Sequence, residues 1–355
     1  MSYFVFDLDE TLAEVYSAYY FIASLKLRET VQTTNSGSKS KSKSKRMHIA
    51  SVPIWLQTEL NRAYECFLQC VLDEETSMKP LGILRPGILD IMSDIHALQC
   101  EGAIKDVVIY SNNGHLESLH FVRDLIHCYL GRTNLIKDCI HWHHPMRDEE
   151  RILIAGFPNK TWNVLRRIMS SPPCHAPHTL HPTDVHFFDD LEHWDLKRVL
   201  KQNYHQVPPY EFKASFERLA AIFRDSLKEA KVSQEAIKEL QDYVIQLFST
   251  AEDTIFISRD DELESILHLF EEKTHGTASP SREPPFWDLG IQQMRDVIVS
   301  LHEGILSRRH KRTDGKNERR GVKRYRSNSN HTRTIPKGGR NPKSRKQRSS
   351  RKRKR

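Results

Sequence analysis

Three short apolar runs are each followed at once by a polar residue that is able to carry chemistry. The runs are Tyr3–Phe6, Val107–Tyr110 and Val185–Phe188, and the residues that follow them are Asp7, Ser111 and Asp189. Short apolar runs of this kind are typical of strands buried in a parallel sheet. Helical spacing of apolar residues lies between the runs, and this alternation predicts a parallel α/β sheet. Ligands bind outside the carboxyl ends of such strands, so we expect the three polar residues to share one edge.

We therefore predict a Rossmann-like α/β domain, a parallel sheet flanked by helices, over residues 1–212. Within it, alternating Lys and Ser predict a flexible loop at about 33–47, because such a segment cannot bury apolar surface. Helical spacing continues over 213–306, which predicts a helical accessory region. Residues 307–355 are too charged and too poor in apolar residues to fold alone, so we expect a disordered basic tail. Weaker strand patterns occur at 139–143, 152–155 and 204–207.

The positive charge of the chain is concentrated at its carboxyl end. Residues 307–355 hold 22 of the 54 basic residues and 2 of the 46 acidic ones, which leaves +20 on the tail and −12 on the rest. This asymmetry indicates a polyanion partner, and we predict that the tail binds nucleic acid through its phosphates. The run Arg351–Arg355 is typical of nuclear localisation signals, so an intracellular, nuclear location is expected. The alternative is a tail that only keeps the protein dissolved.

The sequence gives no sign of a membrane or secreted protein. Its longest apolar runs are a few residues, far below the roughly 20 that a spanning helix needs. The amino terminus lacks a basic segment followed by a long apolar stretch, so no signal peptide is expected. The six cysteines are therefore predicted to be reduced thiols.

The motif Asp7-Leu8-Asp9-Glu10-Thr11 places two carboxylates two residues apart, just after the first predicted strand. One carboxylate can attack phosphorus and form an aspartyl-phosphate, and the other can protonate the leaving oxygen and later deprotonate water. Two carboxylates would repel a phosphate, so a divalent cation is needed, and Mg²⁺ with oxygen ligands suits that task. The plain alternative is that these residues only cap a turn.

Three further elements follow along the chain. Ser111-Asn112-Asn113-Gly114 follows the second apolar run, and its hydroxyl and backbone N–H groups can hold phosphate oxygens. Lys160 lies at a predicted helix start, where a cation is unfavourable unless an anion is near. Asp189-Asp190 follows the third run and suits a metal site. Each element alone is also consistent with an ordinary turn or surface residue.

The order of these elements resembles that of the haloacid dehalogenase-like superfamily. Within it, residues 7–12 read DLDETL, the form seen in the FCP/SCP-type phosphatases that act on the C-terminal domain of RNA polymerase II. Arg85-Pro86-Gly87 and Val207-Pro208-Pro209-Tyr210 resemble two more segments of that family. The chain departs from the family where Thr161-Trp162 replaces the usual Asp-Leu after the lysine, and in its long segment between the first two motifs.

The resemblance implies roles for individual residues. It implies that Asp7 is the nucleophile and that Asp9 is the general acid and base. The implied phosphate contacts are Thr11, Ser111, Asn112 and Lys160, the last also neutralising charge. The implied Mg²⁺ ligands are Asp7, Asp9 through its carbonyl, Asp190 and Asp189. Of the acidic pair, Asp190 is the stronger ligand candidate, and Asp189 places Lys160 or a metal-bound water.

These features lead to three hypotheses for function. The first is a Mg²⁺-dependent phosphatase acting on phosphoserine or phosphothreonine in a phosphoprotein, with the RNA polymerase II C-terminal domain as the substrate that the resemblance implies. The second is a nucleic-acid 3′-phosphatase of the same fold. The third is an inactive phosphatase fold that serves as a nucleic-acid-binding or scaffold protein. A zinc site from the histidine-rich segments is a separate alternative, although their spacing fits no standard pattern; these segments hold His141, His143, His144, Cys174, His175, His178 and His181.

Overall fold

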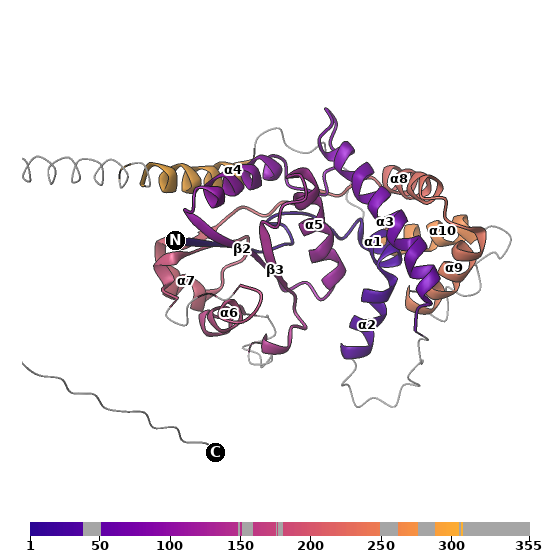
Figure 1. Cartoon of the computed structure of the whole chain (residues 1–355), viewed down its shortest axis with the longest axis horizontal. Coiled ribbons are helices and arrows are strands. Elements are labelled where there is room, and N and C mark those ends of the chain that lie inside the picture. The colour runs from indigo at the N-terminus through magenta and orange to yellow at the C-terminus, as the bar shows by residue number, and fades with distance from the viewer. Residues whose placement is uncertain are drawn as a thin grey trace, which may run out of the picture. The chain divides into compact units, whose positions relative to one another are not determined.

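The computed structural model contains a sheet of five parallel strands, in the order β3-β2-β1-β4-β5 (Figure 1). The strands are β1 (Ser2–Phe6), β2 (Ile104–Tyr110), β3 (Ile136–Ile140), β4 (Val185–Asp189) and β5 (Tyr204–Gln206). The structure describes residues 1–37, 51–147, 150, 159–174, 176, 180–248, 262–275, 288–304 and 307. The predicted parallel α/β sheet is therefore confirmed.

Strand β1 lies in the middle of the sheet because it is apolar on both faces. Phe4 and Val5 are fully buried, and Val5 pairs with Val108 of β2 on one side and Phe187 of β4 on the other. The chain proceeds from β1 outward to β2 and β3 and then returns to β4 on the opposite side of β1. The carboxyl ends of β1 and β4 therefore border a topological switch point, where open α/β sheets form a binding crevice.

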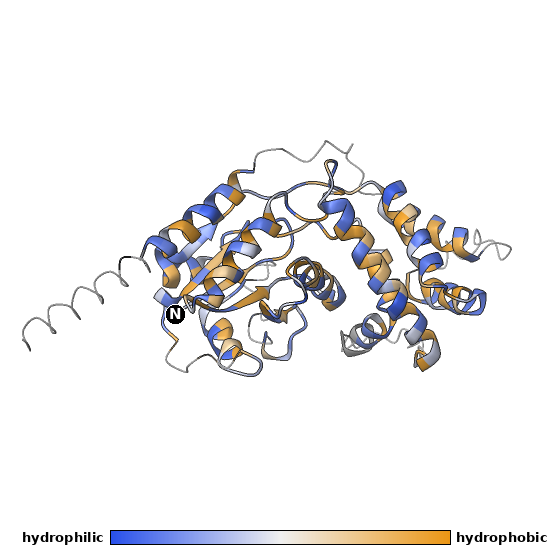
Figure 2. Ribbon diagram, turned by 45° about the horizontal axis from the view of Figure 1, so that its top comes forward, coloured by the Kyte–Doolittle hydropathy of each residue, from blue (hydrophilic) through white to orange (hydrophobic). Residues whose placement is uncertain are grey.

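Helices cover both faces of the sheet. Helices α4 (Ile88–Cys100) and α5 (Leu116–Tyr129) lie on one face, and α6 (Trp162–Met169) and α7 (Trp194–Leu200) lie on the other (Figure 1). Alternate residues of each strand point to opposite faces, so every strand needs apolar residues at successive positions. Figure 2 shows hydrophobic residues along the strands and on one side of the helices.

Helices from two distant parts of the chain form a second apolar core. Helices α1 (Tyr19–Leu25), α2 (Leu27–Gly37) and α3 (Ile54–Glu75) come before β2, whereas α8 (Phe216–Glu229), α9 (Gln234–Phe248) and α10 (Glu262–His275) follow β5. The ring centroid of Phe21 lies 5.5 Å from that of Phe223 and 5.2 Å from that of Phe270. The helices after residue 212 thus share a core with the early helices, and the described residues of Met1–Glu303 form one compact unit.

The structure corrects the predicted Lys/Ser loop at its start. Residues 33–37 continue helix α2, which is anchored upstream where the Thr30 hydroxyl donates to the Glu117 carboxylate of α5 at 3.3 Å. The rest of that loop, the predicted strand at 152–155 and the tail beyond residue 307 lie outside the described residues. The strand predicted at 139–143 begins earlier and ends at Ile140. Within the described ranges, no helix has the length and apolar character to cross a bilayer.

Candidate active site

A buried lysine joins two carboxylates at the carboxyl ends of β1 and β4. Lys160 Nζ lies 2.7 Å from Asp7 Oδ1 and 2.6 Å from Asp189 Oδ2, and the Lys160 side chain is 0% exposed. Lys160 lies two residues before the start of α6, and its side chain reaches the two aspartates at the switch point. An ammonium group buried without partners would cost several kcal/mol, so the two carboxylates are needed to offset its desolvation. Lys160 is therefore part of a built ionic cluster and not a surface residue.

The pKa values in this cluster follow from burial and charge together. Burial disfavours the charged forms, but the carboxylates of Asp189 and Asp7 hold the pKa of Lys160 above its ordinary value. Burial alone would raise the pKa of Asp189, and the ammonium of Lys160 reverses this and lowers it. For Asp7, burial and the charge of Asp189 prevail over Lys160, so its pKa is raised. Asp189 is thus the carboxylate that Lys160 keeps ionised.

His193 also belongs to this cluster, although sequence reasoning did not single it out. Its Nε2 lies 3.2 Å from Asp189 Oδ2, and its Nδ1 accepts a hydrogen bond from the backbone N–H of Lys160 at 3.3 Å. The backbone N–H of Leu191 donates to the other carboxylate oxygen of Asp189 at 2.9 Å. Both carboxylate oxygens of Asp189 are therefore fixed by contacts, and the main effect of Asp189 in this cluster is to position Lys160.

The second aspartate of the acidic pair points toward Asp7. One ligand atom from each of Asp7, Asp189 and Asp190 lies within 4.8 Å of the others, which is close enough to share a cation. Burial and the charges of Asp7 and Asp189 raise the pKa of Asp190 to about 7. Carboxylate oxygens are the ligands that Mg²⁺ prefers, and a cation would relieve this crowding of negative charge. The donor set therefore fits a magnesium ion.

Thr11 and Asp190 form a close pair across the switch point. The Thr11 hydroxyl donates to Asp190 Oδ1 at 3.2 Å, and it accepts from the backbone N–H of Asp190 at 3.0 Å. The hydroxyl of Thr11, predicted as a phosphate contact, is thus engaged in orienting Asp190.

Asp9 lies on the side of the site nearer to β2. Its carboxylate accepts a hydrogen bond from the side-chain amide of Asn113 at 3.1 Å, and the Ser111 hydroxyl lies 3.4 Å away. Burial and the charge of Asp7 raise the pKa of Asp9 to about 7, with the Asn113 hydrogen bond acting in the opposite direction. Asp9 is only half-buried, so it has access to solvent through the adjacent cavity. These are the properties of a group that exchanges a proton near neutral pH.

The two asparagines of the second motif point to different partners. Asn112 Oδ1 accepts a hydrogen bond from Arg147 at 2.7 Å, whereas Asn113 contacts Asp9. The sequence predicted Asn112 as the phosphate contact and gave no role to Asn113. Their order along the turn did not reveal which amide faces the site.

A buried ion pair connects the end of β2 with the start of α6. Arg147 and Glu150 are linked at 2.8 Å, and Arg147 also donates to the carbonyl of Ser111. Glu150 accepts hydrogen bonds from the Tyr110 hydroxyl and from the backbone N–H of Thr161 at 2.6 Å. Because Thr161 adjoins Lys160, this pair fixes Ser111 and Lys160 relative to one another. Sequence reasoning missed it, since a charged segment between strands looks like a solvated loop.

Arg85 supports the first motif from behind. Its guanidinium donates to the backbone carbonyls of Thr11 at 3.3 Å and Pro208 at 2.8 Å, and it pairs with Asp288 at 2.8 Å. It also reaches the carbonyl of Glu10, whose φ of 59° lies in the left-handed region. Such a conformation is strained for a residue other than glycine and persists where surrounding contacts hold it. Arg85 thus joins the Arg-Pro-Gly and Val-Pro-Pro-Tyr segments behind the loop that holds the first motif.

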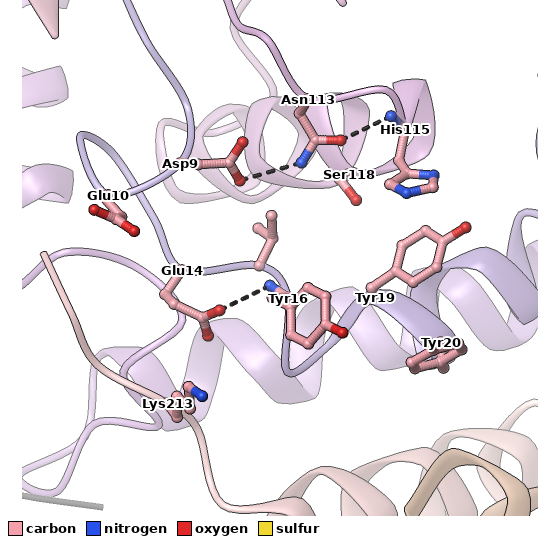
Figure 3. A pocket seen from close by; sticks show the side chains of 11 residues that line it. Asp9, Glu10, Glu14, Tyr16, Tyr19, Tyr20, Asn113, His115, Ser118 and Lys213 are labelled. Carbon is pink, nitrogen blue, oxygen red and sulfur yellow. Dashed lines mark hydrogen bonds between the residues drawn. The ribbon is translucent and has the colours of Figure 1, made fainter. Parts of the chain in front are cut away.

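A cavity of about 500 Å³ opens beside Asp9 (Figure 3). Figure 3 shows Asp9 and Asn113 on one wall, with Glu14, Tyr16 and Tyr19 on the opposite wall. The cavity therefore lies next to the candidate acid and not behind the Lys160 cluster.

The three aspartates are the only group of three or more His, Cys, Asp or Glu side chains close enough to hold a metal within the described part of the chain. His175 and His178 of the proposed zinc ligands lie outside it. No protein-family model matches the chain, and comparisons with curated proteins and with solved structures found no match. The geometry of the site is therefore the basis for assigning a function.

Proposed function

We propose that the chain is a Mg²⁺-dependent phosphatase of the haloacid dehalogenase-like type, with Asp7 as the nucleophile. The observation that carries this proposal is the meeting of Asp7, Lys160 and Asp190 at the crevice between β1 and β4, with Asp9 beside them. A buried cation and several carboxylates at one strand edge suit a reaction in which a dianionic phosphate must be held near acidic groups.

The reaction proceeds in two steps that use the same pair of aspartates. A carboxylate oxygen of Asp7 attacks phosphorus, the bond from phosphorus to the leaving oxygen breaks, and Asp9 gives its proton to that oxygen. Asp9 then takes a proton from water, which attacks phosphorus and releases phosphate and the Asp7 carboxylate. The pKa of Asp9 at about 7 suits both transfers.

The other groups of the site balance charge and set positions. Lys160 offsets the charge of Asp7 and of the phosphate, and Asp189 holds Lys160 in place. Asp7 and Asp190 are the residues that would hold Mg²⁺, which supplies positive charge against the phosphate oxygens when bound. Ser111 lies at the end of β2, where its hydroxyl reaches toward Asp9 and the phosphate position.

For the substrate we propose phosphoserine or phosphothreonine in a protein. The support is the resemblance of the DLDETL, Arg-Pro-Gly and Val-Pro-Pro-Tyr segments to phosphatases of the RNA polymerase II C-terminal domain, together with a cavity that opens beside Asp9. A nucleic-acid partner for the basic tail remains a prediction from the sequence.

The test is hydrolysis of p-nitrophenyl phosphate by the purified full chain. Activity is expected with Mg²⁺, and it should disappear with excess chelator and in Asp7→Asn. Asp90→Asn, on the exposed side of α4, is the matched control and should retain activity. Activity that persists in chelator would contradict the dependence on Mg²⁺. Activity that persists in Asp7→Asn would contradict the role of Asp7 as the nucleophile.

A further inference from the structure

The cavity beside Asp9 is placed to receive whatever is attached to the leaving oxygen. Under the proposed function, Asp9 protonates that oxygen, so the rest of the substrate must extend from the Asp9 side of the phosphate. The cavity begins at Asp9 and Asn113 and continues to the loop and helix α1 that follow the first motif (Figure 3). Its walls are therefore in a position to determine which leaving groups are accepted.

Three tyrosines form the aromatic part of these walls. Tyr16 is 46% exposed, and Tyr19 and Tyr20 are half-buried. The Tyr19 ring lies 4.1 Å from that of His115, and the Tyr20 ring lies 5.2 Å from that of Phe248. Phe248 of helix α9 thus packs against a ring that lines the cavity. The faces of tyrosine rings attract cations.

The charged groups around the cavity are mainly acidic. Glu10 and Glu14 line it, and Glu211 lies close enough to Glu10 for their charges to interact. Lys213 is the one lysine among the lining residues, and its charge acts on Glu14. Burial lowers the pKa of His115, which keeps this imidazole neutral at pH 7. Among the lining residues, one lysine against two glutamates and Asp9 leaves the cavity with net negative charge.

We propose that this cavity binds a lysine or arginine side chain next to the phosphorylated serine or threonine of a polypeptide substrate. Aromatic faces combined with carboxylates form the chemistry that recognises a cation. A nucleic-acid 3′-end is the weaker fit, because each further nucleotide would bring a phosphate toward Glu10 and Glu14. The inference deepens the proposed function and rests on it.

The test compares two phosphoserine peptides that differ only in an arginine or a citrulline beside the phosphoserine. Citrulline keeps the shape of arginine and removes its charge. We expect kcat/KM to be about 10-fold higher for the arginine peptide, the effect of one cation–π contact combined with one charge pair. Equal kcat/KM values, or faster hydrolysis of a 3′-phosphorylated oligonucleotide than of both peptides, would overturn the proposal.

Variants of the cavity give the matched controls. Glu14→Gln and Tyr16→Ala should each lower the arginine-to-citrulline ratio, whereas Tyr16→Phe keeps the ring and should preserve it. Glu65→Gln removes a charge from the exposed side of α3 and should leave the ratio unchanged. A ratio that is insensitive to Glu14→Gln and Tyr16→Ala would assign the preference to another part of the chain and contradict the proposal.

Peptide binding to the Asp7→Asn chain separates this inference from the proposed function. Fluorescence anisotropy should show tighter binding of the arginine peptide without any turnover. Preferential binding with no hydrolysis by the wild type would remove the proposed function and leave the cation site standing. Hydrolysis with no preference, in binding or in kcat/KM, would leave the proposed function standing and remove the cation site.

Discussion

The crevice between β1 and β4 has two sides, and they contain carboxyl groups whose pKa values are shifted in opposite directions. On the paired side, Lys160 contacts Asp7 and Asp189, and the pKa of Asp189 is lowered. On the open side, Asp9 has a neutral amide donor from Asn113 and a cavity next to it, and its pKa is raised to about 7. Burial raises the pKa of every one of these groups, and only at Asp189 do the charge of Lys160 and the hydrogen bond from His193 outweigh it. At Asp7 the same ammonium is outweighed by burial and by the charge of Asp189, so the pKa of Asp7 is raised.

The difference between the pKa values of Asp189 and Asp9 suits the two sides to separate roles. A carboxylate that a buried ammonium keeps ionised can hold charge and position, but it cannot give up a proton near pH 7. A carboxyl group with a pKa near 7 can give and take a proton within one catalytic cycle. Titratable groups whose surroundings push their pKa values apart are typical of acid–base sites. Four predictions test this comparison.

Removing the cation of the paired side should have the largest effect. Lys160→Met leaves Asp189 buried without its ammonium, and we expect the free energy of unfolding to fall by about 3–5 kcal/mol, together with loss of activity. Urea denaturation measures the first and phosphate release the second. The double variant Lys160→Met/Asp189→Asn removes both charges and should recover much of the stability but no activity. A single variant as stable as the wild type would contradict the ionic cluster.

The next largest effect is expected at Asp9, the proposed proton donor of the open side. Asp9→Asn should lower kcat/KM for a phosphoserine peptide by about 10²–10⁴-fold, because its leaving alkoxide needs a proton in the first transfer. The loss should be smaller for p-nitrophenyl phosphate, whose leaving group is stable without one. Steady-state kinetics on both substrates give the comparison. Equal losses would show that Asp9 does not act as the acid.

The link between the two sides should have an intermediate effect. Arg147→Met leaves Glu150 buried without its partner and frees the carbonyl of Ser111, and we expect a loss of about 2–4 kcal/mol in unfolding free energy. Adding Glu150→Gln should restore part of it, because the amide can still accept from Thr161. If the double variant is less stable than the single one, the pair does not act as described.

The smallest effect is expected at Glu75, a carboxyl group outside the crevice whose pKa is also raised by burial. Burial raises the pKa of Glu75 to about 7, and its donors are the backbone N–H groups of Ile83 at 2.7 Å and Leu84 at 3.4 Å. The folded state therefore keeps the proton at pH values where the unfolded state has released it. The stability contributed by this group is thus present at low pH and is lost as pH rises from about 4.5 to 7.

Glu75→Gln should remove this dependence. We expect the variant to match the wild type near pH 4.5 and to exceed it at pH 8 by about 1–3 kcal/mol in unfolding free energy. Denaturation curves at the two pH values measure the difference. A stability difference that is the same at both would rule out a raised pKa for Glu75.

The sequence predicts much of the sheet and part of the site, for a physical reason. Buried strands such as Tyr3–Phe6 must be apolar, and the residues that follow them must lie at one edge, so Asp7, Ser111 and Asp189 could be brought together without coordinates. Lys160 and its place in the order of motifs were visible too. All of these depend on local pattern and on chain order.

The features that the sequence did not predict depend on tertiary packing. Arg147 and Glu150 look like loop charges until the fold buries them between Ser111 and Thr161. The accessory core joins Phe21 with Phe223 and Phe270, and helical spacing alone does not reveal which faces meet.

The most direct test of Asp7 as the nucleophile is to trap the covalent intermediate. Wild-type chain that is turning over a phosphoserine peptide with Mg²⁺ is quenched in acid, treated with borohydride and analysed by peptide mass spectrometry. Borohydride reduces an aspartyl-phosphate to homoserine. Homoserine is expected at position 7 and at none of positions 9, 189 or 190. Active enzyme that yields no homoserine, or homoserine at one of the other positions, would contradict Asp7 as the nucleophile.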